Sequence, residues 1–241
     1  MEGYKAIFYT SCIQLSGKMN CRFCKGTCQK AGRQKNGAQK LYCRGCSKYS
    51  QVSYRYIACK QDNAAMIKRL VCESAGIRSI GRILQIGINT VVRRIVKMAG
   101  SMVAPEHGQS AAWEVDELWT YIGRKENEYW IAYALNRQTR QVVDFVIGKR
   151  TKATLKELID RLLLSTPKVI RTDRLTLYQR IIPKAIHRSG SYCINRIERK
   201  NLTIRTHLKR LSRRTICFNR SAVMLESCLK LYFWQDNSAV T

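Results

Sequence analysis

The chain has 241 residues, 45% of them hydrophobic, which is enough to bury the core of one main domain plus a smaller one. Its 44 Lys and Arg against 16 Asp and Glu give a net charge of +28, which attracts polyanions and indicates a nucleic-acid partner. No run approaches the roughly 18–20 apolar residues that span a bilayer, so we expect no membrane partner.

The first residues contain a mildly apolar patch without a long hydrophobic region or an Ala-x-Ala cleavage site. We therefore expect no secretory signal, and a reducing cytoplasm fits the eleven cysteines better than disulfides do. Residues 1–18 can be read as an N-terminal extension, since Met19 directly precedes the first motif. Met1 and Met19 both remain open as the start.

Two Cys-x2-Cys pairs, 18 residues apart, predict a structural zinc site within residues 19–58. Each pair occupies a tight turn that directs two thiolates at one ion, and four thiolates leave no open position for chemistry. Gly26 and Gly45 give these turns a permissive backbone, and a small β-ribbon between them completes a zinc ribbon. The alternative is a set of unrelated buried thiols. Cys28 is a competing ligand, and the four expected ligands are Cys21, Cys24, Cys43 and Cys46.

Residues 62–99 have helical periodicity. Two apolar faces are followed by Gln85-Ile86-Gly87-Ile88, after which Asn89 offers an N-cap for a helix from Thr90 to Met98. Short helices joined by a Gly-containing turn, the last one basic, match a DNA-binding helix-turn-helix. An ordinary three-helix bundle is the alternative, because packing demands the same spacing. The expected DNA contacts on the last helix are Arg93, Arg94 and Lys97.

A turn-rich linker is expected over residues 100–112, before a catalytic domain over residues 113–236. The domain begins with three β-rich runs, which predict an antiparallel meander. An amphipathic stripe from Leu155 to Leu163 then predicts a helix, and a fourth strand follows. This order of elements is typical of a ribonuclease-H-like fold, in which the first and fourth strands are neighbours.

Three acids in this domain could converge on divalent metal ions. Asp116 lies in the first strand, Asp173 ends the fourth, and Glu198 is the only acid in a basic helical stretch. Hard carboxylates suit Mg²⁺ or Mn²⁺, and two such ions can activate a nucleophile against a phosphodiester. The alternatives are an Asp that starts a turn and a Glu paired with nearby bases on a helix surface. Glu117 should point to the opposite face of an extended strand, so we leave it out of the metal site.

At these residues the chain resembles the transposases of the insertion-sequence-one family. The matching pieces begin with Val115-Asp116-Glu117-Leu118-Trp119 and Thr172-Asp173, with Tyr178 and His187 after them. The most specific piece runs from Arg196 to Leu211, with the pattern Arg-Ile-Glu-Arg-x-Asn-Leu-x-x-Arg-x-x-Leu-x-Arg-Leu. The zinc ribbon and helix-turn-helix also match, so the resemblance covers about Met19 to Trp234.

The resemblance implies a DDE triad of Asp116, Asp173 and Glu198 on a ribonuclease-H-like core that uses two Mg²⁺ or Mn²⁺ ions. It implies a DNA transposase that binds the inverted-repeat ends of its element, cleaves them and transfers the strands to target DNA. Two ends are processed together, so at least a homodimer is expected on double-stranded DNA, in a prokaryotic cytoplasm at the nucleoid.

Further DNA contacts are expected around the acids. His187 is a candidate phosphate contact, and Asn201 and Arg205 share the helix face of Glu198 by their spacing. A basic run after them is read as a phosphate-binding surface rather than a merely solvated one. Its members are Lys209, Arg210, Arg213 and Arg214.

One departure from the family pattern supports a rival function. Arg174 follows Asp173 where the family usually has Gly, so a cation stands beside an expected metal ligand. The rival is a DNA-binding regulator of the same descent that no longer cuts. A third reading, a ribosome-associated RNA-binding protein, explains the charge and the zinc ribbon but leaves the three acids without a role.

Overall fold

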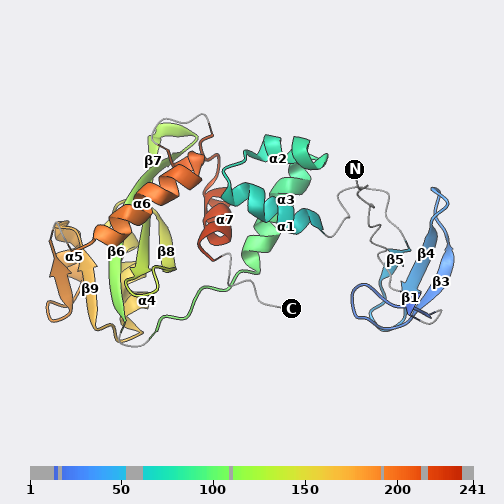
Figure 1. Cartoon of the computed structure of the whole chain (residues 1–241), viewed down its shortest axis with the longest axis horizontal. Coiled ribbons are helices and arrows are strands. Elements are labelled where there is room, and N and C mark those ends of the chain that lie inside the picture. The colour runs from blue at the N-terminus through green and yellow to red at the C-terminus, as the bar shows by residue number, and fades with distance from the viewer. Residues whose placement is uncertain are drawn as a thin grey trace, which may run out of the picture. The chain divides into compact units, whose positions relative to one another are not determined.

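A computed structural model of the chain describes residues 14–15, 18–52, 62–108, 111–190, 193–212 and 217–234. The chain divides into two compact units, Met1–Asn63 and Ala64–Thr241, each described here by itself (Figure 1). Among the described residues, no helix has the length and apolar character needed to cross a membrane.

The first unit is a small β-structure around the cysteines. β3 (Cys28–Arg33), β4 (Gln39–Cys43) and β5 (Tyr49–Gln51) form an antiparallel sheet in that order. The β3–β4 turn contains Gly37 at φ +77°, a conformation that glycine adopts without strain. This sheet is the expected β-ribbon, and a two-stranded sheet of β1 (Gln14–Leu15) and β2 (Lys18–Met19) precedes it.

Three helices follow the first unit: α1 (Asp62–Cys72), whose first two residues still belong to that unit, α2 (Ile77–Leu84) and α3 (Ile88–Gly100). α2 ends at Gln85, whose left-handed backbone turns the chain into α3. The expectation that Asn89 caps the last helix is wrong, because α3 begins at Ile88 and its N-cap is Gly87. Asn89 lies inside the first turn, and the helix begins after the extended Gly87, two residues earlier than the capping signal indicated. α3 packs against α2 and against α7 near the end of the chain.

A mixed five-stranded sheet forms the centre of the second unit, with the order β10-β9-β6-β7-β8. β6, β7 and β8 form the predicted antiparallel meander, while β9 pairs parallel with β6 and β10 pairs parallel with β9. The expected adjacency of the first and fourth strands is therefore observed. The strands are β6 (Ala112–Ile122), β7 (Arg124–Asn136), β8 (Val142–Gly148), β9 (Val169–Thr172) and β10 (His187–Ser189).

Helices cover both faces of this sheet (Figure 1). α4 (Lys152–Leu163) and α5 (Thr176–Ile181) pack on the face that carries Trp113 and Val115. α6 (Asn195–His207) and α7 (Ala222–Phe233) pack on the face that carries Leu118 and Tyr133, and a 3-10 turn (Lys209–Leu211) follows α6. The predicted amphipathic helix is confirmed as α4, which buries Leu155, Leu158, Ile159 and Leu162.

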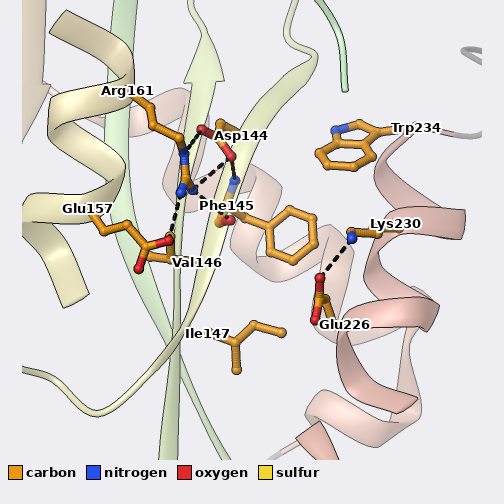
Figure 2. A pocket seen from close by; sticks show the side chains of 9 residues that line it. All are labelled: Asp144, Phe145, Val146, Ile147, Glu157, Arg161, Glu226, Lys230 and Trp234. Atoms are coloured by element: carbon orange, nitrogen blue, oxygen red, sulfur yellow. Dashed lines mark hydrogen bonds and ion pairs between the residues drawn. The ribbon is translucent and has the colours of Figure 1, made fainter. Parts of the chain in front are cut away.

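The outer edge of β8 is capped by side chains, as Figure 2 shows for Asp144, Phe145 and Arg161. Asp144 Oδ1 accepts the Phe145 N–H at 2.7 Å, and Arg161 donates to the Phe145 carbonyl at 3.3 Å. Arg161 also donates to both carboxylate oxygens of Asp144, at 2.6 and 3.1 Å. On the same strand, Trp234 Nε1 donates to the Val142 carbonyl at 3.1 Å. Side chains therefore provide hydrogen-bond partners for these backbone N–H and C=O groups of β8.

Candidate metal centres

An acidic cluster lies where β6 and β9 run side by side. Carboxylate oxygens of Asp116, Glu117 and Asp173 all lie within 4.8 Å of one another. Asp116 lies in the middle of β6, and Asp173 directly follows the last residue of β9, so the parallel pairing of the two strands brings the acids together. Local bonds orient both side chains: Asp116 Oδ1 accepts the Glu117 N–H at 2.8 Å, and Asp173 Oδ1 accepts the Leu175 N–H at 3.0 Å.

Burial and mutual repulsion make this cluster unfavourable for negative charge. Burial raises the pKa of Asp116 from 3.8 to about 6, and the nearby carboxylates of Asp173 and Glu198 add to the rise. Burial also raises the pKa of Glu117, to about 7, against the opposing effect of Arg150. The buried Tyr178 hydroxyl interacts with the Glu117 carboxylate and also opposes the rise. Three carboxylates this close together are a donor set that suits a hard divalent cation.

The prediction that Glu117 points to the opposite face agrees with the structure, yet its carboxylate joins this cluster, and its exclusion from the metal site stays a prediction. Strand alternation does put it on the other face of β6, where Arg150 Nη2 lies 3.4 Å from its Oε2. However, the side chain is long enough to bring a carboxylate oxygen back within 4.8 Å of Asp116 and Asp173. Alternation predicts the direction of Cβ but does not limit the reach of a Glu carboxylate.

Glu198 lies outside this three-residue cluster but on the same side of the sheet as Asp116. It is exposed in the first turn of α6, and its charge contributes to the raised pKa of Asp116. One helical turn later, Asn201 Nδ2 donates to Asp116 Oδ2 at 2.6 Å. Asn201 Oδ1 in turn accepts the Tyr133 hydroxyl at 2.7 Å. Asn201, expected to contact DNA, is thus bonded within the protein and connects α6 to the acid.

His187 lies on β10 beside the end of β9. Its Nε2 lies 2.8 Å from the Thr172 hydroxyl, one residue before Asp173. Burial lowers the pKa of His187, and Arg188 lowers it further. Arg174 is exposed, whereas Asp173 beside it is partly buried.

The other expected DNA contacts lie on three separate segments. Arg93, Arg94 and Lys97 lie on α3. Arg205 donates to the Leu211 carbonyl at 2.8 Å, and Arg210 Nη1 lies 3.4 Å from Asn219 Oδ1, so both have partners inside the protein. Lys209 is exposed in the 3-10 turn, and Arg213 and Arg214 lie outside the described residues.

The four predicted zinc ligands come together in the first unit. Sγ atoms of Cys21, Cys24, Cys43 and Cys46 lie within 4.8 Å of one another. The two Sγ atoms are 3.5 Å apart in the Cys21–Cys46 pair and also in the Cys24–Cys43 pair. Thiolates at ~2.3 Å from one zinc ion stand roughly 3.8 Å apart, so the arrangement fits a tetrahedral site.

Backbone N–H groups favour the thiolate form of two of these cysteines, whereas burial raises the pKa of Cys46 to about 12. The N–H groups of Cys24 and Phe23 lower the pKa of Cys21 to about 6, and the Cys46 N–H lowers the pKa of Cys43. A Cβ on Gly26 or Gly45 would lie 3.5 to 3.9 Å from the cysteine sulfurs, so both glycines lie directly beside the cluster.

Sequence reasoning missed the residues that hold α6 to the sheet. Glu114 is fully buried, and its Oε2 accepts the Ile197 N–H of α6 at 2.9 Å. Its Oε1 lies 3.7 Å from Arg137 Nε. The signal was available, because Glu114 shares the face of Asp116 by alternation and a buried acid needs a partner.

Carboxylates gathered at neighbouring central strands define a candidate divalent-cation site of the kind that metal-dependent nucleotidyltransferases use. Residues 111–236, just over half of the chain, match the family described as IS1 transposase. The chain belongs to the IS1 transposase family, which confirms the resemblance found in its sequence.

Curated relatives include three InsB proteins of insertion elements. The iso-IS1n InsB protein of Shigella dysenteriae is 40% identical over 116 residues, which is 48% of this chain and 88% of that protein. The IS1 InsB protein of Shigella flexneri is 37% identical over 119 residues, 49% of this chain and 91% of the relative. The IS1 4 InsB protein of Escherichia coli K12 is 35% identical over 119 residues, which is 49% of this chain and 71% of that protein.

Among solved structures, one match is a chain of the simian T-cell lymphotropic virus intasome in complex with the PP2A regulatory subunit B56 gamma. It has 15% identity and a TM-score of 0.34, and it covers 60% of this chain and 59% of the viral complex's chain. The TM-score is too low for this likeness to bear on the fold.

Proposed function

We propose that this protein is a DNA transposase that cleaves the inverted-repeat ends of its insertion element and joins them to target DNA. The observation that carries the proposal is the carboxylate cluster of Asp116, Glu117 and Asp173 at adjacent central strands, in a chain of the IS1 transposase family. The strand order, with a parallel fourth strand beside the first, supports a ribonuclease-H-like catalytic core.

Asp116 and Asp173 are the proposed principal ligands of Mg²⁺ or Mn²⁺, with Glu198 as the third member of a DDE triad. Such ions supply a Lewis acid and a deprotonated oxygen nucleophile for phosphodiester attack. Glu117 fits a supporting role, because one of its carboxylate oxygens lies within 4.8 Å of both aspartates, while Arg150 pairs with its Oε2. The site needs no nucleophilic side chain, since water and a DNA 3′-hydroxyl are the attacking groups.

The remaining parts are proposed to bind DNA. The four-cysteine cluster supports a structural zinc ribbon, and the Gly87 turn between α2 and α3 supports a helix-turn-helix that reads the element ends. With a net charge of +28, phosphate contacts should supply much of the affinity. Since two ends are joined together, we propose at least a dimer on DNA.

The test is a cleavage and strand-transfer assay on the element's own terminal DNA, with Mg²⁺, Mn²⁺ or no divalent ion. The decisive variant is Asp173→Asn, and the matched control is Asp160→Asn, which changes an exposed acid on α4 paired with Lys156. Metal-dependent 3′-hydroxyl products that are lost only in Asp173→Asn would support the proposal.

End binding without cleavage in any metal, by zinc-loaded and folded protein, would instead favour the DNA-binding regulator. Arg174→Gly would then show whether the cation beside Asp173 is responsible. Preference for structured RNA over duplex ends at matched salt would favour the RNA-binding reading.

A further inference from the structure

Glu114 makes a long-range cap on α6, the helix that faces the candidate catalytic acid. α6 begins after Ile194, whose apolar side chain cannot accept hydrogen bonds from the free N–H groups of the first turn. Glu114 Oε2 accepts the Ile197 N–H at 2.9 Å, from a strand 83 residues earlier in the chain. A carboxylate at a helix N-terminus also interacts favourably with the helix dipole.

Few apolar anchors hold α6 in place. Within the helix, only Ile197 and Ile204 are buried. The polar anchors therefore contribute strongly to its rotation and height above the sheet: Glu114 at the first turn and the Asp116–Asn201–Tyr133 chain one turn later. Both acceptor acids are on the same face of β6, two residues apart, so the strand's own repeat sets the spacing of the two anchors.

Arg137 completes this support. Its Nε lies 3.7 Å from Glu114 Oε1, and its carbonyl oxygen accepts a hydrogen bond from Arg196 of α6. Glu114 is fully buried, so its charge depends on these two partners, the helix N-terminus and Arg137. Loss of the carboxylate should therefore change mainly the position of α6 on the sheet.

We propose that Glu114 is a positioning residue for the metal centre: by holding the Ile197 N–H, it sets α6 so that Asn201 bonds Asp116 and Glu198 faces the acidic cluster. This inference rests on the proposed function. Glu114 is not among the clustered acids; its Oε2 is bonded to α6 and its Oε1 lies 3.7 Å from Arg137 Nε.

The test measures Mn²⁺ affinity of the full zinc-loaded chain by electron paramagnetic resonance, without DNA. Glu114→Gln keeps the size of the side chain and weakens the cap, and should raise the Mn²⁺ dissociation constant by about 10-fold or more, the usual effect of a support residue. Asp144→Asn is the matched control, because it removes another buried, arginine-paired carboxylate of the same sheet. It should change the dissociation constant by less than about twofold.

Wild-type affinity in Glu114→Gln, or equal weakening in Asp144→Asn, would overturn the proposal. A second measurement needs no variant: in the wild type, the Ile197 amide should exchange with solvent more slowly than the Asn195 and Arg196 amides of the same turn. Equal exchange at the three amides would also overturn it. The proposed function fails if the wild type shows no Mn²⁺ binding, or only binding that Asp116→Asn leaves intact. In that case the amide exchange still decides whether the cap exists.

Discussion

Replacing Asp116 by Asn should stabilise the metal-free protein at high pH. The pKa of Asp116 is about 6 in the folded protein against an ordinary 3.8, so the folded state holds its proton more tightly than the unfolded state does. Wild-type stability therefore falls as the pH rises from about 4 through 6, and the full penalty remains above that window. At about 1.4 kcal/mol per pKa unit, the penalty at pH 8 is about 3 kcal/mol.

Asn removes this charge but loses one bond. Asn201 donates its amide group to Asp116 Oδ2 and uses its oxygen to accept from Tyr133, so a second amide at position 116 cannot satisfy all donors. A lost hydrogen bond costs about 1 kcal/mol at any pH. We therefore expect Asp116→Asn to be more stable than wild type by about 2 kcal/mol at pH 8, and to match it within about 1 kcal/mol at pH 4.5.

The assay is urea unfolding in resin-treated buffer, followed by tryptophan fluorescence. All four tryptophans, Trp113, Trp119, Trp130 and Trp234, lie in the second unit, so the signal reports the unit that holds the acids. Adding Mg²⁺ should stabilise the wild type and leave the variant unchanged. A stability difference that is the same at both pH values would refute the reasoning, because the substitution removes the titration of Asp116, whereas Glu117, which also has a raised pKa, is present in both proteins.

Three further predictions concern other parts of the molecule. Cys43→Ser should abolish zinc binding, measured by metal analysis, while the tryptophan-detected unfolding of the second unit stays unchanged; retained stoichiometric zinc would contradict the four-cysteine site. Arg161→Met should lower the unfolding free energy by about 1–3 kcal/mol, since it leaves the buried Asp144 carboxylate with only the Phe145 N–H and His107 as partners. Lys156→Met at the exposed Lys156–Asp160 pair should change it by less than about 0.5 kcal/mol. Arg188→Gln should raise the pKa of His187 in an NMR titration but leave it below 6.5, because burial is the larger cause of the lowered value; an unchanged pKa would exclude the influence of Arg188.

The sequence predicted the parts of the fold that depend on local pattern. Alternating β-rich runs and the stripe from Leu155 to Leu163 correctly indicated the meander and α4, because each pattern reflects one buried face. The paired cysteine spacing likewise predicted a cluster that the first unit forms. The start of α3 was misplaced, since Gly87 carries no side-chain signal that competes with Asn89.

The contents of the acid site were harder to predict because they depend on reach and on distant partners. Glu117 points away from Asp116 at Cβ yet returns to the cluster at its carboxylate, which no periodicity shows. The bond from Glu114 to Ile197 joins residues 83 positions apart, and only the fold brings them together. The roles of Asp116, Asp173 and Glu198 in catalysis stay predictions.

The two edges of the five-stranded sheet limit how copies of this chain can assemble. At one edge, Arg161, Asp144 and Trp234 cover backbone groups of β8; at the other, β10 offers only three residues, His187–Ser189. Open edges of long strands invite strand addition from another molecule, and both edges here are blunted. Pairing of two copies edge to edge through this sheet is therefore disfavoured.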